Sequence, residues 1–168
     1  MNRMYTTKVI LIVLISFFTT LFITSSKSYE NYTLIKFHIK QNEGFKNRVY
    51  LDTLGNLTVG YGHKLRKADG YKLGDYVATA RIDRWFQADF NTALRCARVF
   101  LRNDYNQKEL IVITDMAYNL GCKTLNDFWR LRKHINNKDY SMAIRAIKGS
   151  NYYKQVTNRA NRNIALLK

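Results

Sequence analysis

Two carboxylic acids and a threonine stand at a spacing that suits the hydrolysis of a glycosidic bond. Glu43, Asp52 and Thr58 occur in the pattern E-x8-D-x5-T. Glycoside hydrolysis commonly uses two carboxyl groups, one protonated to donate to the leaving oxygen and one ionised to act on water or on the sugar. The pattern therefore predicts a glycosidase site, with Glu43 as the proton donor.

A helical segment leads into Glu43 and stops directly after it. Apolar residues repeat at helical spacing from about residue 33, namely Leu34, Ile35, Phe37 and Ile39. Gly44 then favours the end of the helix, because glycine readily adopts the left-handed conformation that follows a last turn. A carboxyl group in the last turn lies at the negative end of the helix dipole, which disfavours its ionisation. This position suits a general acid.

Beyond the helix the pattern changes to that of a β-hairpin. A Gly-Asn pair at 55–56 separates two short apolar runs, as in a turn between antiparallel strands. With a loop at 54–56, Asp52 and Thr58 are cross-strand neighbours on one face and can share a water molecule, with Asp52 as its base. The alternative is that Asp52 only caps a turn and Thr58 is an ordinary strand residue. Their joint spacing from Glu43 favours the shared water.

With these residues in place, the chain resembles the phage-type lysozymes, the endo-acting muramidases typified by the bacteriophage T4 enzyme (glycoside hydrolase family 24). Glu43, Asp52, Thr58 and the Gly-Tyr-Gly-His run at 60–63 match the family's N-terminal motif in type and spacing. Three later segments also resemble parts of the family. Residues 85–89 resemble its long connecting helix, 118–121 its Phe-Asn-x-Gly segment, and 157–162 the Arg-bearing start of a later helix. The resemblance covers nearly everything after residue 30.

The resemblance implies a role for each of the matched residues. Glu43 would be the general acid, Asp52 and Thr58 would position the attacking water, and Arg159 would be a structural partner near Glu43. The activity implied is cleavage of the β-1,4 bond between N-acetylmuramic acid and N-acetylglucosamine. Inversion is expected, because the water would lie opposite Glu43. Neither a metal nor an organic cofactor is expected.

Other residues are candidates for substrate contact and for support. Asn119 matches the family segment, whereas Tyr61 and Tyr152 could offer ring faces to sugars or could equally belong to the core or the surface. His63 is expected, through the resemblance, to pair with Asp89, which interrupts the apolar stripe of the long helix. A solvated Asp89 at the edge of that stripe is the alternative.

The order of elements predicts an α+β fold that is mainly helical and lysozyme-like. A small α/β lobe with the β-hairpin is joined by a long helix, at about 77–101, to a helical C-terminal lobe, and the substrate cleft lies between the lobes. Asn106 and Glu109 resemble a capping box that opens a helix ending at Gly121. Shorter helices are expected around 128–135, 143–147 and 164–167.

The first 28 residues have the layout of a secretory signal. Residues 1–8 are basic without an acid, 9–23 are largely apolar, and 24–28 are small and polar. The apolar run is short for a membrane span of about 20 residues. We therefore expect cleavage of 1–28, a catalytic domain at 29–168 and a secreted or periplasmic protein. An uncleaved membrane anchor at 9–23 is the alternative.

The formal net charge of +16 predicts an anionic partner. Peptidoglycan, with its stem carboxylates, and other anionic polymers of the cell envelope qualify. The competing class is a basic module that binds the cell wall or nucleic acid without turnover. Against this class, the basic residues are dispersed along the chain, and a binding module has no need of the Glu43, Asp52 and Thr58 set. We expect a monomeric enzyme that binds no nucleic acid and contacts the membrane only through its N-terminal segment.

Two cysteines, Cys96 and Cys122, are present. In an oxidising compartment they could form a disulfide, but the sequence gives no distance between them, and we expect two separate, part-buried thiols. The sequence lacks the Cys/His spacing of a zinc motif, a glycine-rich phosphate loop and a serine nucleophile elbow.

Overall fold

The structure is a computed structural model that describes residues 32–102 and 104–168. The segments predicted to be a signal or an anchor lie outside these described residues. Residues 35–168 form one unit in which a small antiparallel sheet is followed by helices, which confirms the expected α+β, mainly helical fold. No helix within the described residues is both long enough and apolar enough to cross a membrane.

The sheet follows the helix that ends at Glu43, which comprises residues 32–43. Its strands are β1 (Lys46–Leu51), β2 (Leu57–Gly60) and β3 (His63–Lys64), in the order β1-β2-β3 with antiparallel pairing. Tyr50 lies opposite Thr58, so the predicted hairpin is confirmed. A short 3-10 helix, η1 (Lys67–Asp69), follows the sheet.

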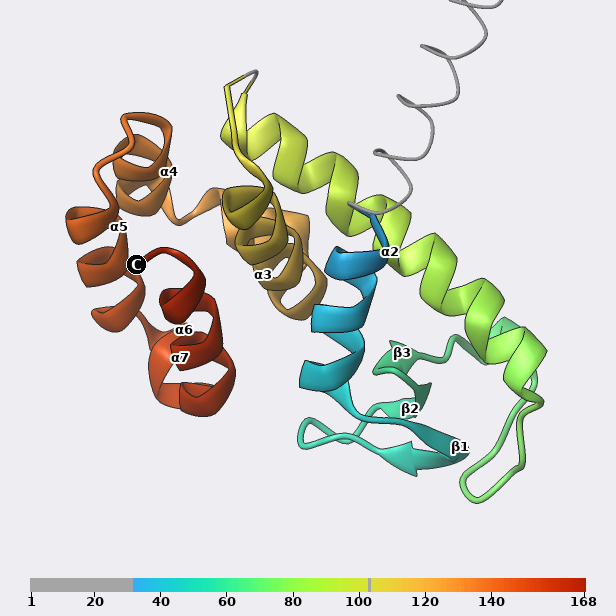
Figure 1. Ribbon diagram of the computed structural model, residues 1–168. Coiled ribbons are helices and arrows are strands. Elements are labelled where there is room, and N and C mark those ends of the chain that lie inside the picture. Colours follow the sequence, from blue (N-terminus) through green and yellow to red (C-terminus); the bar gives the residue numbers. More distant parts are fainter. Residues whose placement is uncertain (1–31, 103) are drawn as a thin grey trace, which may run out of the picture. The chain divides into compact units, whose positions relative to one another are not determined.

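The long helix α2 (Thr79–Leu101) begins two residues later than predicted and runs from the sheet to the C-terminal helices (Figure 1). Its apolar stripe is buried, and the stripe consists of Ile82, Phe86, Phe90, Ala93, Leu94, Ala97, Phe100 and Leu101. At the sheet end, Ile82 packs with Val49, Val59 and Val77 in one apolar cluster. The helix therefore fixes the sheet and the helical region to one another.

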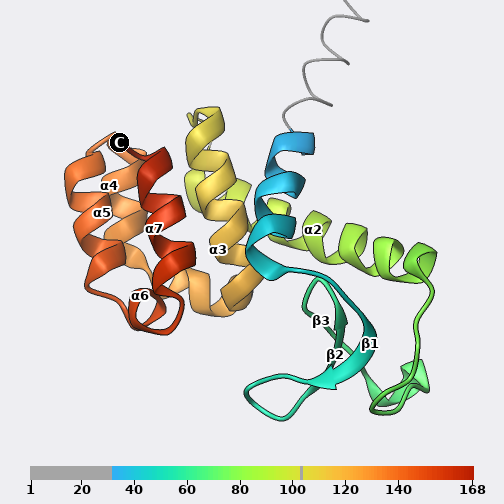
Figure 2. The ribbon, with the colours of Figure 1, turned by 60° about the horizontal axis from the view of Figure 1, so that its bottom comes forward.

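The C-terminal region is a group of helices packed beside α2 (Figure 2). They are α3 (Gln107–Asn126), α4 (Trp129–Asn136), α5 (Tyr140–Lys148), α6 (Asn151–Gln155) and α7 (Thr157–Leu166). The predicted capping box opens α3, with Asn106 and Glu109 each accepting the other's backbone N–H. Gly121, with φ 77° and ψ 159°, interrupts α3 where a helix end was predicted.

A disulfide joins α2 to α3 through Cys96 and Cys122, whose Cα atoms are 5.6 Å apart. The expectation of two separate thiols was therefore wrong. The physical reason is tertiary: α2 packs along α3, and the break at Gly121 redirects the chain one residue before Cys122. Neither the helix packing nor this redirection can be read from the spacing of the cysteines.

Candidate active site

Glu43 lies between the end of its helix and the loop that joins β2 to β3. Its side chain is 17% exposed. Gly44 ends the helix with a φ of 70°, as predicted. Gly62, in the loop, has a φ of 81°, and a Cβ atom at this position would lie 3.0 Å from Glu43 Oε2. Glycine is thus favoured at residue 62 for two reasons, the left-handed backbone conformation and the closeness of the carboxyl group.

Arg159, from α7, binds the other oxygen of Glu43. Its Nη1 donates to Glu43 Oε1 at 2.5 Å, so the predicted partnership is present. Asp115, from α3, accepts from the rest of the guanidinium, with Nε to Oδ2 at 2.9 Å and Nη2 to Oδ1 at 2.8 Å. The side chains of Arg159 and Asp115 are only 6% and 0% exposed. A buried, bidentate ion pair with Asp115 therefore orients Arg159 towards Glu43.

Two asparagines complete the hydrogen bonding of Asp115. Asn42 donates to Oδ1 at 2.9 Å and Asn163 donates to Oδ2 at 2.7 Å. Asn163 also donates to the hydroxyl of Tyr152 at 3.0 Å. A buried charge is tolerated when it is paired and its remaining acceptor sites are filled, and this arrangement meets both conditions. The network fixes Asp115, and through Arg159 it fixes Glu43.

Opposing influences act on the proton affinity of Glu43. Burial raises its pKa above the ordinary value, the Arg159 guanidinium lowers it, and the Asp115 carboxylate raises it again. The net result is a raised pKa. Because burial outweighs the Arg159 charge, with a smaller contribution from Asp115, the arginine can orient Glu43 while the carboxyl group still tends to keep its proton.

Asp52 follows β1 and organises the tip of the hairpin. Its Oδ1 accepts the backbone N–H groups of Leu54 and Asn56 at 2.9 and 2.8 Å, and its Oδ2 accepts from the Asn56 side-chain amide at 3.0 Å. These bonds to Asn56 are the main reason that the pKa of Asp52 falls to about 2, with Lys64 contributing less. Asp52 does cap the turn, as the alternative proposed, and the capping keeps its carboxylate ionised.

Thr58 and Asp52 lie on one face of the hairpin, but they are diagonal rather than directly opposite neighbours. The residue opposite Thr58 is Tyr50, and Asp52 bonds across to Asn56. Diagonal positions are about 7–8 Å apart, which leaves room for a small ligand between the two side chains. Thr58 is buried and donates its hydroxyl to the Asn56 carbonyl at 3.1 Å. Its oxygen remains able to accept a hydrogen bond.

Tyr50 links the two carboxyl groups electrostatically. Burial and then the negative charges of Glu43 and Asp52 raise the pKa of its hydroxyl. Tyr50 lies opposite Thr58 in the hairpin, on the face that also carries Asp52. Asp52 and Thr58 thus share one face of the hairpin, and Glu43 lies against Gly62 in the loop that follows β2, the strand of Thr58.

His63 forms the predicted pair with Asp89. His63 Nδ1 lies 2.7 Å from Asp89 Oδ2, and the imidazole stacks on Trp85 with ring centroids 4.7 Å apart. The pair joins β3 to α2, so Asp89 is not simply solvated at the edge of the stripe. It holds His63, which directly follows Gly62, against α2.

The three substrate-contact candidates differ in their accessibility. Asn119 is exposed on α3, next to the break at Gly121. Tyr61 is half-buried, and its ring lies 5.1 Å from the rings of Phe45 and Phe86. Asn119 can therefore meet a polymer directly, whereas most of the Tyr61 ring is used in packing.

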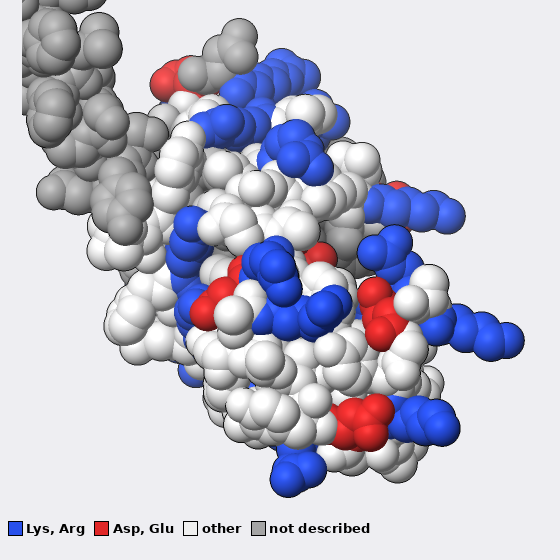
Figure 3. Space-filling model, turned by 90° about the vertical axis from the view of Figure 1, so that its right-hand side faces the viewer, with Lys and Arg blue, Asp and Glu red and all other residues white. Residues whose placement is uncertain are grey.

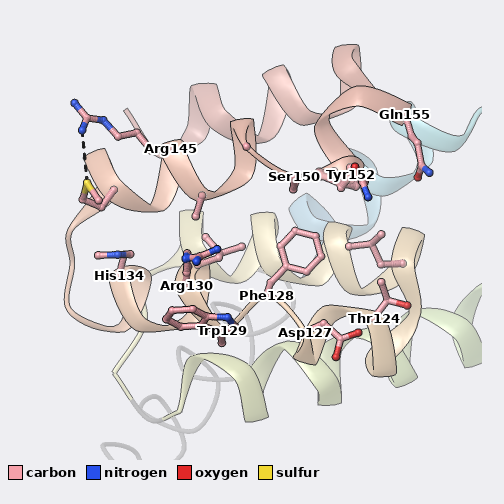
Figure 4. Close-up of a pocket in the computed structure, with 16 residues that line it drawn as sticks. Thr124, Asp127, Phe128, Trp129, Arg130, His134, Arg145, Ser150, Tyr152 and Gln155 are labelled. Atoms are coloured by element: carbon pink, nitrogen blue, oxygen red, sulfur yellow. Dashed lines mark hydrogen bonds between the residues drawn. The ribbon is translucent and has the colours of Figure 1, made fainter.

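Tyr152 is 2% exposed, so its assignment as a sugar contact is corrected: it is a core residue that supports Asn163. Tyr152 also forms part of the wall of a pocket of about 610 Å³ in the helical region, shown in Figure 4. Other residues that line this pocket are Leu120, Thr124, Asp127, Phe128, Trp129, Arg130, His134 and Arg145. Leu120, which lines this pocket, directly follows Asn119 in the sequence.

Asp115, Gly62 and Tyr50 were not identified as site residues from the sequence. Asp115 did carry a signal, because it is the one charged residue in the apolar run at 110–117. A buried carboxylate must have a charged or hydrogen-bonding partner, so the run could have pointed to Asp115 as the partner of Arg159. Tyr50 and Gly62 carried no comparable signal beyond their places in the motif.

Comparisons with known proteins agree with this geometry. Residues 40–163 match the family described as phage lysozyme. Two proteins of Dictyostelium discoideum, named "Probable T4-type lysozyme 2" and "Probable T4-type lysozyme 1", are 23% and 24% identical to this chain over 158 residues. Each alignment covers 79% of this chain and 92% of the relative.

Proposed function

Because the chain belongs to the phage lysozyme family, we propose that it hydrolyses the β-1,4 bond between N-acetylmuramic acid and N-acetylglucosamine, within the glycan chain and with inversion. Membership of the family makes the protein a lysozyme-type enzyme that acts on peptidoglycan. The observation that carries the finer proposal is the contrast between two carboxyl groups whose charges both act on the Tyr50 hydroxyl. Glu43 has a raised pKa and Asp52 has a pKa of about 2. Such divergence is expected of an acid and base pair.

Glu43 is the proton donor in this proposal. Arg159 occupies Oε1, so the transferable proton is carried on Oε2, the oxygen beside Gly62. This proton passes to the glycosidic oxygen as the bond to the anomeric carbon breaks, and the leaving sugar departs with a hydroxyl group. Glu43 is left as a carboxylate, which the Arg159 guanidinium stabilises at that moment.

Asp52 and Thr58 position the attacking water. The water donates one hydrogen bond to Asp52 and one to the Thr58 oxygen, and its own oxygen faces the anomeric carbon opposite Glu43. As the new bond forms, Asp52 accepts the proton that the water loses. Attack on the face opposite the leaving group converts the β-linkage into an α-configured reducing end.

The substrate contacts and cellular placement belong to the same proposal. Asn119, which is exposed on α3, would contact the glycan chain, and the net charge of +16 suits peptidoglycan and other anionic envelope polymers. The N-terminal residues 1–28 would direct export to the periplasm or the exterior, and the enzyme would act as a monomer. Mass spectrometry of the exported protein tests this, since an intact N-terminus would indicate an anchor at 9–23.

Glu43→Gln tests the assignment of the acid. The substitution keeps the shape of the side chain but removes the transferable proton, and general acid catalysis contributes roughly 10²–10⁴-fold. We expect the clearing of purified walls to slow by a factor in this range. Asp104→Asn is the matched control, because the Asp104 side chain is 93% exposed. A folded Glu43→Gln protein that clears walls at a near-normal rate would contradict the assignment.

A further inference from the structure

One face of α2 carries a row of arginines that the catalytic site does not use. The row consists of Arg81, Arg84, Arg95 and Arg98, with Arg102 directly after the helix, and all five are exposed. At 100° per residue the four helical positions, Arg81, Arg84, Arg95 and Arg98, fall within a sector of about 100°, and they extend over roughly 25 Å from Arg81 to Arg98. We call this set the arginine row.

The acidic residues of α2 do not pair with Arg81, Arg84, Arg95 or Arg102. The helix contains two, and each pairs with a cation from another element: Asp83 with Lys40 at 3.4 Å and Asp89 with His63 at 2.7 Å. Within residues 32–102 and 104–168, no acidic side chain forms an ion pair with Arg81, Arg84, Arg95 or Arg102. On the face of the molecule shown in Figure 3, most of the surface is uncharged, and Lys and Arg side chains cover more of it than Asp and Glu side chains do.

A hollow of about 470 Å³ lies at the C-terminal end of the arginine row. It is lined by Arg98, Val99, Arg102 and Tyr105. Arg132, from α4, donates to the Val99 carbonyl at 3.2 Å and brings a further cation to this end. Guanidinium groups bind phosphate through paired hydrogen bonds, and a phenol hydroxyl can add another. The hollow therefore suits a phosphate group better than a neutral sugar.

We propose that this face binds a linear phosphodiester polymer of the cell envelope, with one phosphate in the hollow and the following phosphates along the arginine row. An extended, narrow row of cations fits a linear polyanion, because each guanidinium can neutralise one phosphate along the chain. The choice of an envelope polymer rests on the proposed function, which places the enzyme in the cell wall.

Two other anionic partners, single-stranded nucleic acid and a membrane surface, fit the arginine row less well. Single-stranded nucleic acid gains much of its affinity from bases stacked on exposed aromatic rings. On α2, however, Phe86, Phe90 and Phe100 are buried and Trp85 is stacked on His63. A membrane surface is bound by helices whose apolar face is available to lipid, whereas the apolar stripe of α2 is buried in the core. Val99 is the only large apolar side chain that α2 exposes.

The expected consequence is retention on walls that carry such a polymer. The arginine row and the catalytic residues are different parts of the chain, so one enzyme molecule can hold the polymer and cleave a neighbouring glycan. Binding at a second site raises the effective concentration of the enzyme at its substrate.

The test is equilibrium binding of fluorescently labelled poly(glycerol phosphate) to the folded protein at several salt concentrations. We expect the triple variant Arg95→Gln/Arg98→Gln/Arg102→Gln to bind about 10- to 100-fold more weakly and to show a shallower salt dependence, because about three phosphate contacts are lost. The matched control is Lys67→Gln/Lys72→Gln/Lys148→Gln, which removes the same charge from exposed positions elsewhere. It should change the affinity by less than about threefold.

Three results would overturn the proposal: an equal loss in both triple variants, equal wild-type affinity for polyglutamate, or clearly tighter binding of a thymidine oligonucleotide. The first would mean diffuse attraction by net charge, the second a lack of phosphate preference, and the third a nucleic-acid partner. Because binding is measured without turnover, and can be repeated with Glu43→Gln, a failure here is separate from a failure of the muramidase assignment.

Discussion

Gly62→Ala isolates the close contact between the β2–β3 loop and the catalytic acid. The new methyl group would lie 3.0 Å from Glu43 Oε2 and 3.6 Å from Glu43 Cδ, so the carboxyl group must shift by a few tenths of an ångström. A misplacement of 1 Å at a reacting group can cost about 10²-fold in rate. For this smaller shift we expect the clearing of walls to slow by about tenfold.

The substitution also forces a residue with a Cβ atom into the left-handed backbone region. Gly62 has a φ of 81°, and this conformation costs roughly 1–2 kcal/mol for a residue other than glycine. In a protein of this size, that cost lowers the midpoint of thermal unfolding by about 2–8 °C. Stability alone would therefore not account for a tenfold loss of rate at 25 °C.

Gly70→Ala provides the matched control. Gly70 has a φ of 75°, and a Cβ atom there would meet nothing within 4 Å. Both variants should show a similar fall in the thermal midpoint by circular dichroism, but only Gly62→Ala should lose activity. If the two variants cleared walls equally fast, the contact between Gly62 and Glu43 would not position the acid and the reasoning would be refuted.

Two further substitutions test the buried network and the disulfide. Asp115→Asn removes a negative charge that helps to raise the pKa of Glu43, so this pKa should fall and the alkaline limb of the pH–activity profile should move to lower pH. The fold should lose about 3 kcal/mol, because one partner of a buried ion pair is removed. An unchanged profile in a folded Asp115→Asn protein would show that Asp115 does not act on Glu43. Cys96→Ser/Cys122→Ser removes a link between residues 26 apart, which should lower the free energy of unfolding by about 3–4 kcal/mol. Urea titration measures this, and wild-type protein kept in reductant should match the variant; equal stability of the oxidised protein and the variant would count against a stabilising disulfide.

The raised pKa of Glu43 also has a defined sign in the pH dependence of stability. A carboxyl group whose folded-state pKa lies above 4.5 favours the fold when it is protonated, so its contribution is fully present below 4.5. That contribution is lost as the pH rises through the folded-state value. In Asp115→Asn the folded-state pKa of Glu43 is lower, so its contribution to stability should be lost at a lower pH. The activity profile should shift in the same direction.

Local patterns predicted most of the elements that carry the site. The helix end at Gly44, the hairpin turn at 55–56 and the capping box at Asn106 each depend on residues adjacent in sequence, and all three are present. The pairs His63–Asp89 and Glu43–Arg159 join distant segments, and they were expected only because the matched motifs resemble one family. Periodicity alone would not have paired them.

The features that were missed depend on how separate elements pack. The disulfide requires α2 to lie along α3 with a break at Gly121, which the spacing of the cysteines does not reveal. The aromatic ring and hydroxyl of Tyr152 suit a sugar contact, but the packing of α6 against α7 buries this side chain, and its hydroxyl accepts a hydrogen bond from Asn163. Likewise, the arginine row is dispersed in sequence and becomes one face only because α2 is a single long helix.

The anomeric form of the first products tests the central claim most directly. Purified peptidoglycan is digested, and the new reducing ends are followed by NMR before they equilibrate. The account predicts reducing N-acetylmuramic acid ends that appear first as the α-anomer, because water held by Asp52 and Thr58 attacks opposite Glu43. Products dominated by 1,6-anhydromuramic acid would show that no water attacks, and an initial β-anomer would show a covalent intermediate; either result would contradict the inverting mechanism.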